Sequence, residues 1–150
     1  MKAIVLDSAP LGLLTQRIGV ADADNCRRWM AARTMSGLRI VIPEIIDYEL
    51  RRELIRAGKT SSVSRLNQFL LHPSVDYLPL TTAAMRLAAE LWAQIRSQGL
   101  PTADPLALDI DVILAAQVTA SGIPLNEAIV ATSNAAHIGR FLQASDWTQI

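Results

Sequence analysis

Apolar residues along the chain fall into short and long runs, which together predict strands that alternate with helices. The first run, residues 2–6, is rich in Ile and Val, is too short for a helix, and ends at an Asp-Ser-Ala-Pro segment. Three later runs are similarly short, and one of them ends at Pro43. We therefore expect four strands, at residues 2–6, 38–42, 75–80 and 128–132.

The longer segments between these runs carry helix start and stop signals. Pro43 presets the backbone for a first helical turn, and Gly58 favours a helix end. Thr81 begins another amphipathic run that stops at Gly99. We expect helices at residues 22–33, 44–57, 60–71, 82–98 and 106–120, a short last helix entered through Asn134, and an edge strand at residues 147–150.

This alternation predicts the fold class. Strands that recur between helices favour parallel pairing through right-handed crossovers, with helices on both faces of the sheet. The expected fold is therefore α/β, a three-layer α/β/α sandwich with a central, mainly parallel sheet. The length is usual for one domain, and no repeat or linker interrupts it, so we expect a single domain over residues 1–150. Ligands of such folds bind beyond the carboxyl ends of the strands, where Asp7 and Thr132 fall.

Charge and composition narrow the class of protein. The 14 basic and 14 acidic residues cancel, so any contact with RNA must come from a local patch rather than from overall charge. The chain reaches Asp7 too early for a signal peptide, and no later apolar run is long enough to span a bilayer. We therefore expect a cytoplasmic protein without a membrane partner. The lone Cys26 cannot form an internal disulfide, and helix packing is its expected role.

Two acids interrupt a helix that should be buried. Residues 106–118 are apolar on nearly all sides of the expected helix, yet they include Asp109 and Asp111. A buried carboxylate is costly unless it is paired or bound to a cation. Asp111 shares a face with the apolar residues three, four and seven positions later, whereas Asp109 should point elsewhere unless it lies in a loop or first turn. The alternative is that Asp104 or Asp109 only caps the helix or adds a favourable charge at its start.

The helix after the second strand supplies a third candidate acid, Glu49. It follows two apolar residues by three and four positions, so it lies on the apolar stripe. Asp47 lies on the opposite side and is expected to be a surface acid, and Glu53 is expected to face Arg56 or solvent. For Glu49, the alternative is a partly exposed residue paired with Arg52.

Asp7, Glu49 and Asp111 come from separate segments, and each is placed to point at the strand ends. Carboxylate oxygens are the ligands that Mg²⁺ or Mn²⁺ prefers. Such an ion can lower the pKa of a bound water and neutralise charge as a phosphodiester is displaced. The pattern therefore predicts a site for one or two divalent ions.

The segment after the first strand argues against two other enzyme classes. It lacks the closely spaced glycines that a dinucleotide pyrophosphate needs. An aspartyl-phosphate hydrolase would usually carry a second acid two residues after the first, where this chain has Ala9.

Four short motifs follow one another along the chain. They are Ile4-Val5-Leu6-Asp7-Ser8, then Ile42-Pro43 with Tyr48-Glu49-Leu50, then Asp111-Val112-Ile113-Leu114-Ala115-Ala116-Gln117, and Ala131-Thr132-Ser133-Asn134 with His137 and Phe141 behind it. In this order and separation they resemble the motifs of PIN-domain ribonucleases of the VapC toxin type, over essentially the whole chain. The resemblance implies a metal-dependent endoribonuclease, the toxin of a type II toxin-antitoxin pair silenced by a small antitoxin, and commonly a homodimer. It assigns catalysis and metal binding to Asp7, Glu49 and Asp111.

The fourth motif departs from this family, which often has an Asp in or just after the Thr-x-Asn segment. Here the chain has Asn134 and His137, with no acid until Asp146. Asn134 could ligate a metal through its carbonyl, orient a water, or serve as a plain helix cap. We take Asp109, Thr132 and Asn134 as supporting residues. The departure also supports an alternative function: a noncatalytic PIN-fold module that binds protein or nucleic acid.

Basic residues follow Glu49 and offer a candidate RNA contact. Arg52 and Arg56 are the proposed substrate-binding pair, because RNA phosphates would flank a metal site. The alternative is a solvated helix face. Aromatic and Met side chains on the helix at residues 22–33 would suit the contact surface of a homodimer.

Overall fold

The centre of the protein is one sheet of five parallel strands. The computed structural model describes residues 1–99 and 105–150, so Asp104 lies outside the described residues. The strand order is β3-β2-β1-β4-β5, and every pair is parallel. The strands are β1 (Ala3–Leu6), β2 (Arg39–Pro43), β3 (Val75–Leu78), β4 (Ala128–Ala131) and β5 (Ala144–Ser145). The four expected strands are confirmed, and so is the parallel sheet.

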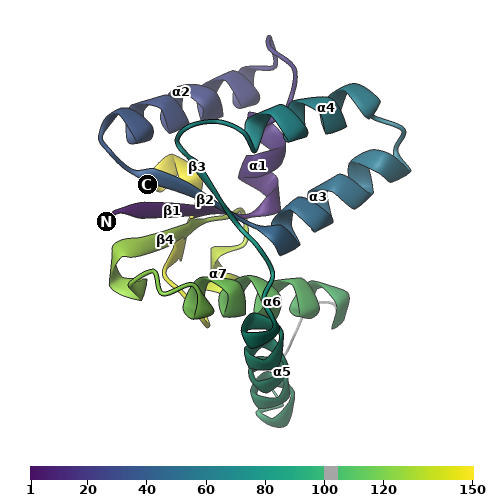
Figure 1. Ribbon diagram of the computed structural model, residues 1–150, viewed down its shortest axis with the longest axis vertical. Coiled ribbons are helices and arrows are strands. Elements are labelled where there is room, and N and C mark those ends of the chain that lie inside the picture. Colours follow the sequence, from purple (N-terminus) through teal and green to yellow (C-terminus); the bar gives the residue numbers. More distant parts are fainter. Residues whose placement is uncertain (100–104) are drawn as a thin grey trace.

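Helices cover both faces of this sheet. Figure 1 shows α1, α2 and α4 above it and α5 and α6 below it, which confirms the three-layer α/β/α sandwich. No helix within the described ranges is long and apolar enough to cross a membrane. The helices are α1 (Ser8–Leu14), α2 (Ala21–Met35), α3 (Glu44–Arg56), α4 (Thr60–Phe69), α5 (Thr82–Ser97), α6 (Pro105–Ala120) and α7 (Ala135–Ile138), with 3₁₀ turns at Leu125–Glu127 and Trp147–Gln149.

The expectation of an edge strand at residues 147–150 is wrong. The edge strand is β5, which lies just before this segment, and Trp147–Gln149 forms a 3₁₀ turn. Asp146 starts the turn, because its carboxylate accepts a hydrogen bond from the Thr148 backbone N–H at 2.9 Å. The Trp147 ring packs edge-on against Trp29 of α2, with ring centroids 5.7 Å apart. Local capping and this aromatic contact therefore outweigh the β-propensity of the tail.

Helix α6 packs against the sheet on one side and against α5 on another, which explains why its sequence is apolar on nearly all sides. On one side Ile110, Leu114 and Val118 join the main core with the strands. On another side Val112 and Ala116 pack in a second cluster with α5. The expected burial of this helix is confirmed, and the same holds for Cys26 of α2, which is fully buried.

Gln117 of α6 connects three elements through its buried amide. The Ile45 backbone N–H at the start of α3 donates to Gln117 Oε1 at 3.1 Å. The amide nitrogen of Gln117 donates to the Leu78 carbonyl of β3 at 2.8 Å. Since Pro43, the residue before α3, provides no side-chain cap, Gln117 fulfils that role from another helix. It thereby fixes α3 and α6, which carry two of the candidate acids, relative to the sheet.

Replacing Gln117 by Leu should destabilise the fold. The substitution introduces an apolar side chain of similar size and leaves a buried N–H and a buried carbonyl without partners, at a cost of about 2–4 kcal/mol. Urea unfolding measures this loss. The matched control is Gln94→Leu on the exposed face of α5, which should change stability by less than about 0.5 kcal/mol. Equal stabilities for the two variants would contradict the bridging role.

Candidate active site

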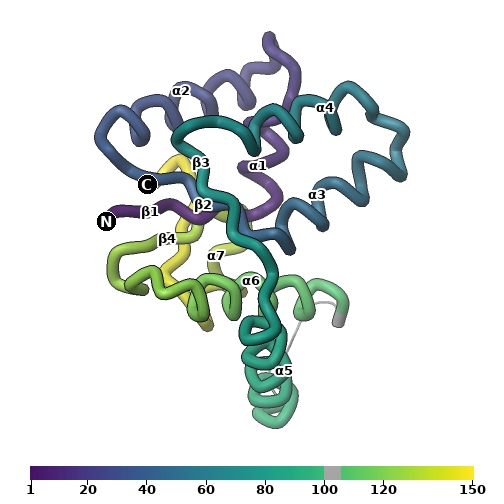
Figure 2. Tube along the Cα trace, viewed as in Figure 1, coloured from purple at the N-terminus to yellow at the C-terminus, as the bar shows by residue number. Residues whose placement is uncertain are grey.

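The candidate site lies where the direction of strand addition reverses. From β1 the chain adds β2 and β3 on one side, and later β4 on the other. In Figure 2 the end of β1 leads into the start of α1, close to the start of α3. Asp7 directly follows β1, and Thr132 directly follows β4. Both polar side chains therefore emerge at the carboxyl ends of adjacent strands, as parallel sheets require.

Asp7 is held by hydrogen bonds on both carboxylate oxygens. Oδ1 accepts from the Ser8 backbone N–H at 2.7 Å, which caps α1. Oδ2 accepts from the Thr132 hydroxyl at 2.6 Å, and Thr132 Oγ1 in turn accepts from the Asn134 backbone N–H at 2.9 Å. The fully buried Thr132 thus holds the Asp7 carboxylate in place.

Glu49 approaches the same point from α3. The Ser8 hydroxyl donates to Glu49 Oε1 at 3.1 Å, so one serine lies between the two acids. Glu49 Oε2 is buried and has no hydrogen-bond partner within the described residues. A buried carboxylate oxygen without a donor is costly, and a bound cation would remove that cost.

The three acids influence one another electrostatically. Burial raises the pKa of Asp111 to about 7, and the neighbouring charges of Asp7 and Glu49 add to this effect. Burial also raises the pKa of Glu49, with a further contribution from Asp7, while the Ser8 hydrogen bond opposes the shift. The three acids are far apart in the sequence, yet they lie close enough in the fold for their negative charges to repel one another. Mutual repulsion of this kind is what a divalent cation relieves.

The donor chemistry fits a hard divalent cation, although the side chains do not already enclose one. Across residues 1–99 and 105–150, no three His, Cys, Asp or Glu side chains are arranged to hold one ion as they stand. Mg²⁺ usually binds proteins through one or two carboxylates and keeps several waters, so it does not require such an enclosure. A cation bound here would supply the partner that the buried Glu49 Oε2 lacks among the described residues.

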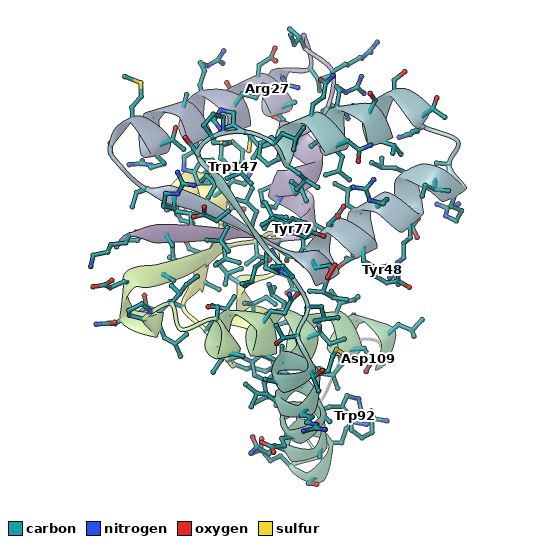
Figure 3. All side chains as sticks on the ribbon, viewed as in Figure 1. Arg27, Tyr48, Tyr77, Trp92, Asp109 and Trp147 are labelled. Atoms are coloured by element: carbon teal, nitrogen blue, oxygen red, sulfur yellow. The ribbon has the colours of Figure 1, made fainter. Side chains whose placement is uncertain are left out.

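Asp109 does not join the acids. It is exposed and lines an apolar groove of about 410 Å³ between α5 and α6, together with Met85 and Trp92. Figure 3 shows Asp109 and Trp92 in the lower part of the molecule, away from the sheet. Because Asp109 lies only two residues before Asp111, the two side chains leave α6 in different directions. Asp109 is therefore poorly placed to replace the acid that the resembled family often has in the fourth motif, where this chain has Asn134 and His137.

The expectation that Asp47 is a surface acid is wrong. Asp47 is only 8% exposed, and its carboxylate accepts hydrogen bonds from Arg51 at 3.0 Å and from the Tyr77 hydroxyl at 3.0 Å. Figure 3 labels Tyr77, which crosses to α3 from β3. The face of α3 opposite the apolar stripe is thus covered by another strand, which a helical wheel cannot show.

The candidate substrate arginines are exposed on α3. Arg56 forms an ion pair with Glu53 at 2.8 Å, as expected for Glu53. Arg52 lies over the Tyr48 ring, 5.1 Å from its centroid. The charge of Arg52 partly offsets the rise in the pKa of Glu49, so this charge reaches the site.

Two residues at the site were not singled out from the sequence. The Ser8 hydroxyl donates a hydrogen bond to Glu49, and the position of Ser8 directly after Asp7, as the first residue of α1, was the available signal. The charge of Arg140 lowers the pKa of Asp111, and only the fold brings the segment after α7 to α6. Asn134 stands at the start of α7, but its side chain does not cap the helix. Its Nδ2 lies 2.9 Å from His137 Nδ1 instead.

Replacing Thr132 by Val should disturb the site through Asp7. The isosteric change removes the hydroxyl that donates to Asp7 and accepts from Asn134, at an expected cost of about 1–3 kcal/mol. Chemical denaturation measures the difference. Thr132→Ser keeps the hydroxyl and should recover most of the loss. A Val variant as stable as the Ser variant would show that the hydroxyl does not matter.

Solved structures with the same fold include VapC toxins and VapBC complexes. VapBC2 from Rickettsia felis, bound to a DNA fragment from its promoter, aligns with a TM-score of 0.67 and 17% identity over 97% of this chain and 98% of that chain. VapC20 from Mycobacterium tuberculosis, a sarcin-ricin loop cleaving toxin, aligns with a TM-score of 0.66 and 14% identity, over 93% of this chain and 95% of that chain. DNA-bound VapBC from Salmonella typhimurium aligns with a TM-score of 0.64 and 18% identity, over 98% of this chain and 99% of that chain.

These matches define the fold over nearly the whole chain. No protein-family model and no curated protein matches the sequence itself. The resemblance to PIN-domain VapC toxins suggested by the four motifs is confirmed at the level of the fold.

Proposed function

We propose that this protein is a metal-dependent endoribonuclease that acts in the cytoplasm as the toxin of a type II toxin-antitoxin pair. The main support is the acidic site at the carboxyl ends of β1 and β4. There Asp7, Glu49 and Asp111 come from three elements of a VapC-like fold, and burial and mutual repulsion raise the pKa values of Glu49 and Asp111.

Mg²⁺ or Mn²⁺ is the proposed cofactor, held by Asp7, Glu49 and Asp111. When bound, it supplies a water of lowered pKa and positive charge for the displaced phosphodiester. The protein keeps these carboxylates in place: Thr132 and Ser8 orient Asp7, and Ser8 also orients Glu49. Arg52 and Arg56 are exposed on α3, and we propose that they contact flanking RNA phosphates.

The proposed partners are an RNA substrate, an antitoxin protein and a second copy of this chain. Solved structures with this fold include VapBC complexes, which supports the antitoxin. The dimer surface expected on α2 is wrong, because Met30 is buried and the Trp29 ring packs against Trp147. The proposed homodimer is supported instead by exposed apolar side chains, among them Met85 and Trp92 beside the groove between α5 and α6.

A second candidate function is a noncatalytic PIN-fold module that binds protein or nucleic acid. The observation in its favour is the fourth motif, where Asn134 and His137 stand in place of an acid. Asp109 faces the groove between α5 and α6, so it is poorly placed to replace this acid.

Cleavage of RNA decides between these candidates. Purified protein is incubated with labelled RNA and Mn²⁺ or Mg²⁺, and the reaction is repeated with EDTA. The proposed ribonuclease cuts internally and stops with EDTA. RNA that is bound but left intact with either ion would favour the noncatalytic module.

A further inference from the structure

His137 lies directly beside Asp111 in the candidate site. Its Nδ1 atom is 4.0 Å from Asp111 Oδ2, and the two side chains are 30% and 17% exposed. The neighbouring Ile138 is fully buried, so α7 is anchored to the core at this point. A fixed helix therefore presents the imidazole to the carboxylate of α6.

Asn134 holds the imidazole in this orientation. The Asn134 Nδ2 atom lies 2.9 Å from His137 Nδ1, one helical turn away. When the imidazole is neutral and Nδ1 is unprotonated, the amide donates to the Nδ1 lone pair. The same Nδ1 lone pair would bind a metal ion. The Nδ1 atom is also the ring nitrogen that lies 4.0 Å from Asp111 Oδ2.

We propose that His137 is a ligand of the bound metal ion beside Asp111, and that its nitrogen makes the site prefer first-row transition ions over Mg²⁺. The inference rests on the proposed metal-dependent function and deepens it. Mg²⁺ favours oxygen ligands, whereas imidazole nitrogen suits transition ions. Where the resembled family often has an acid, this chain would therefore offer a nitrogen donor.

The geometry requires only a small adjustment. Two ligands at about 2.1 Å from an ion and at right angles to each other are roughly 3.0 Å apart. His137 Nδ1 and Asp111 Oδ2 would have to approach by about 1 Å from their present 4.0 Å. Rotation of two partly exposed side chains can supply this, with the ion replacing the Asn134 amide as the partner of Nδ1.

Electron spin-echo spectroscopy of bound Mn²⁺ tests the ligand directly, because a coordinated imidazole produces ¹⁴N modulation. The chain has two histidines, which provides a matched pair of variants. His137→Gln should lose the modulation. His72→Gln should keep it, since the exposed His72 ring accepts a hydrogen bond from the Ser74 backbone N–H and lies outside the acidic site.

Calorimetric titration tests the preference among ions. We expect His137→Gln to bind Co²⁺ about tenfold more weakly than the wild type, with Mg²⁺ affinity little changed. His72→Gln should match the wild type with both ions. Equal losses for Co²⁺ and Mg²⁺ would contradict the role of nitrogen in ion preference.

The outcomes separate this inference from the proposed function. Wild-type protein that binds Mn²⁺ without ¹⁴N modulation overturns the His137 ligand but leaves a metal-dependent nuclease intact. Protein that binds no Mn²⁺ overturns both. If His137→Gln failed to fold, His72→Gln would still decide the question, because His137 is then the only histidine left to give the signal.

Discussion

Asp7→Asn should slow Mn²⁺-dependent RNA cleavage by at least about 100-fold. A metal ion supplies several kcal/mol of stabilisation to a phosphoryl transition state, and each 1.36 kcal/mol corresponds to a factor of ten in rate. The substitution removes the charge that follows β1 but keeps Oδ1, which can still accept from the Ser8 N–H. The fold should therefore survive while the cation loses a ligand. The rate of cleavage of an end-labelled RNA measures the effect.

Asp22→Asn provides the matched control for charge. Asp22 is an exposed acid at the start of α2, away from the strand ends, so this variant should cleave at the wild-type rate. Cleavage that persists in Asp7→Asn, or that continues in EDTA, would mean that the activity does not use this site. A contaminating nuclease would show this behaviour.

Adding Mn²⁺ to metal-free protein should raise its melting temperature by roughly 5–10 °C. An ion present at about 100 times its dissociation constant adds about 2.7 kcal/mol, and a domain of this size converts that into such a shift. Differential scanning calorimetry with increasing Mn²⁺ measures it. Asp111→Asn should respond little, because it removes a proposed ligand, the acid whose pKa burial and the neighbouring charges of Asp7 and Glu49 raise to about 7.

Without metal, Asp111→Asn should be more stable than the wild type above about pH 7. The folded-state pKa of Asp111 is raised to about 7, so the folded protein holds a proton there that the unfolded chain has already released. Stability therefore falls as the pH rises from about 4 to about 7, by at most about 4 kcal/mol. The Asn variant avoids this loss, and its advantage should disappear below about pH 4.

Asp109→Asn is the control on the same helix. Asp109 is exposed in the groove between α5 and α6, so its removal should leave both the Mn²⁺ shift and the pH dependence unchanged. Asp47→Asn is unsuitable for this purpose, because Asp47 is buried and bonded to Arg51 and Tyr77. A full Mn²⁺ shift in Asp111→Asn would exclude Asp111 as a ligand.

The alternation of short and long apolar runs was enough to determine the fold class. Strands buried on both faces appear as continuous runs of Val and Ile, and the helices between them require parallel crossovers. Two site positions also follow from the sequence. Asp7 and Thr132 end strands, so any parallel pairing of β1 with β4 brings them to one edge of the sheet.

Helical periodicity placed Glu49 and Asp111 correctly on inward faces, because each falls on the apolar stripe of its own helix. The same method failed for Asp47, which lies opposite that stripe. Periodicity shows which side of a helix faces the sheet, but Tyr77 of β3 covers another side of α3. Burial on that side depends on the order of the strands.

Contacts between distant segments were decided only by the tertiary structure. The bridge from Gln117 to Ile45 and Leu78, and the approach of His137 to Asp111, join residues that no local pattern connects. The sequence by itself determined which elements form and which way most side chains face, since these depend on periodicity within each element. Only the packing of those elements decided which polar groups meet, because hydrogen bonds and charge interactions act over a few ångströms of space regardless of separation along the chain.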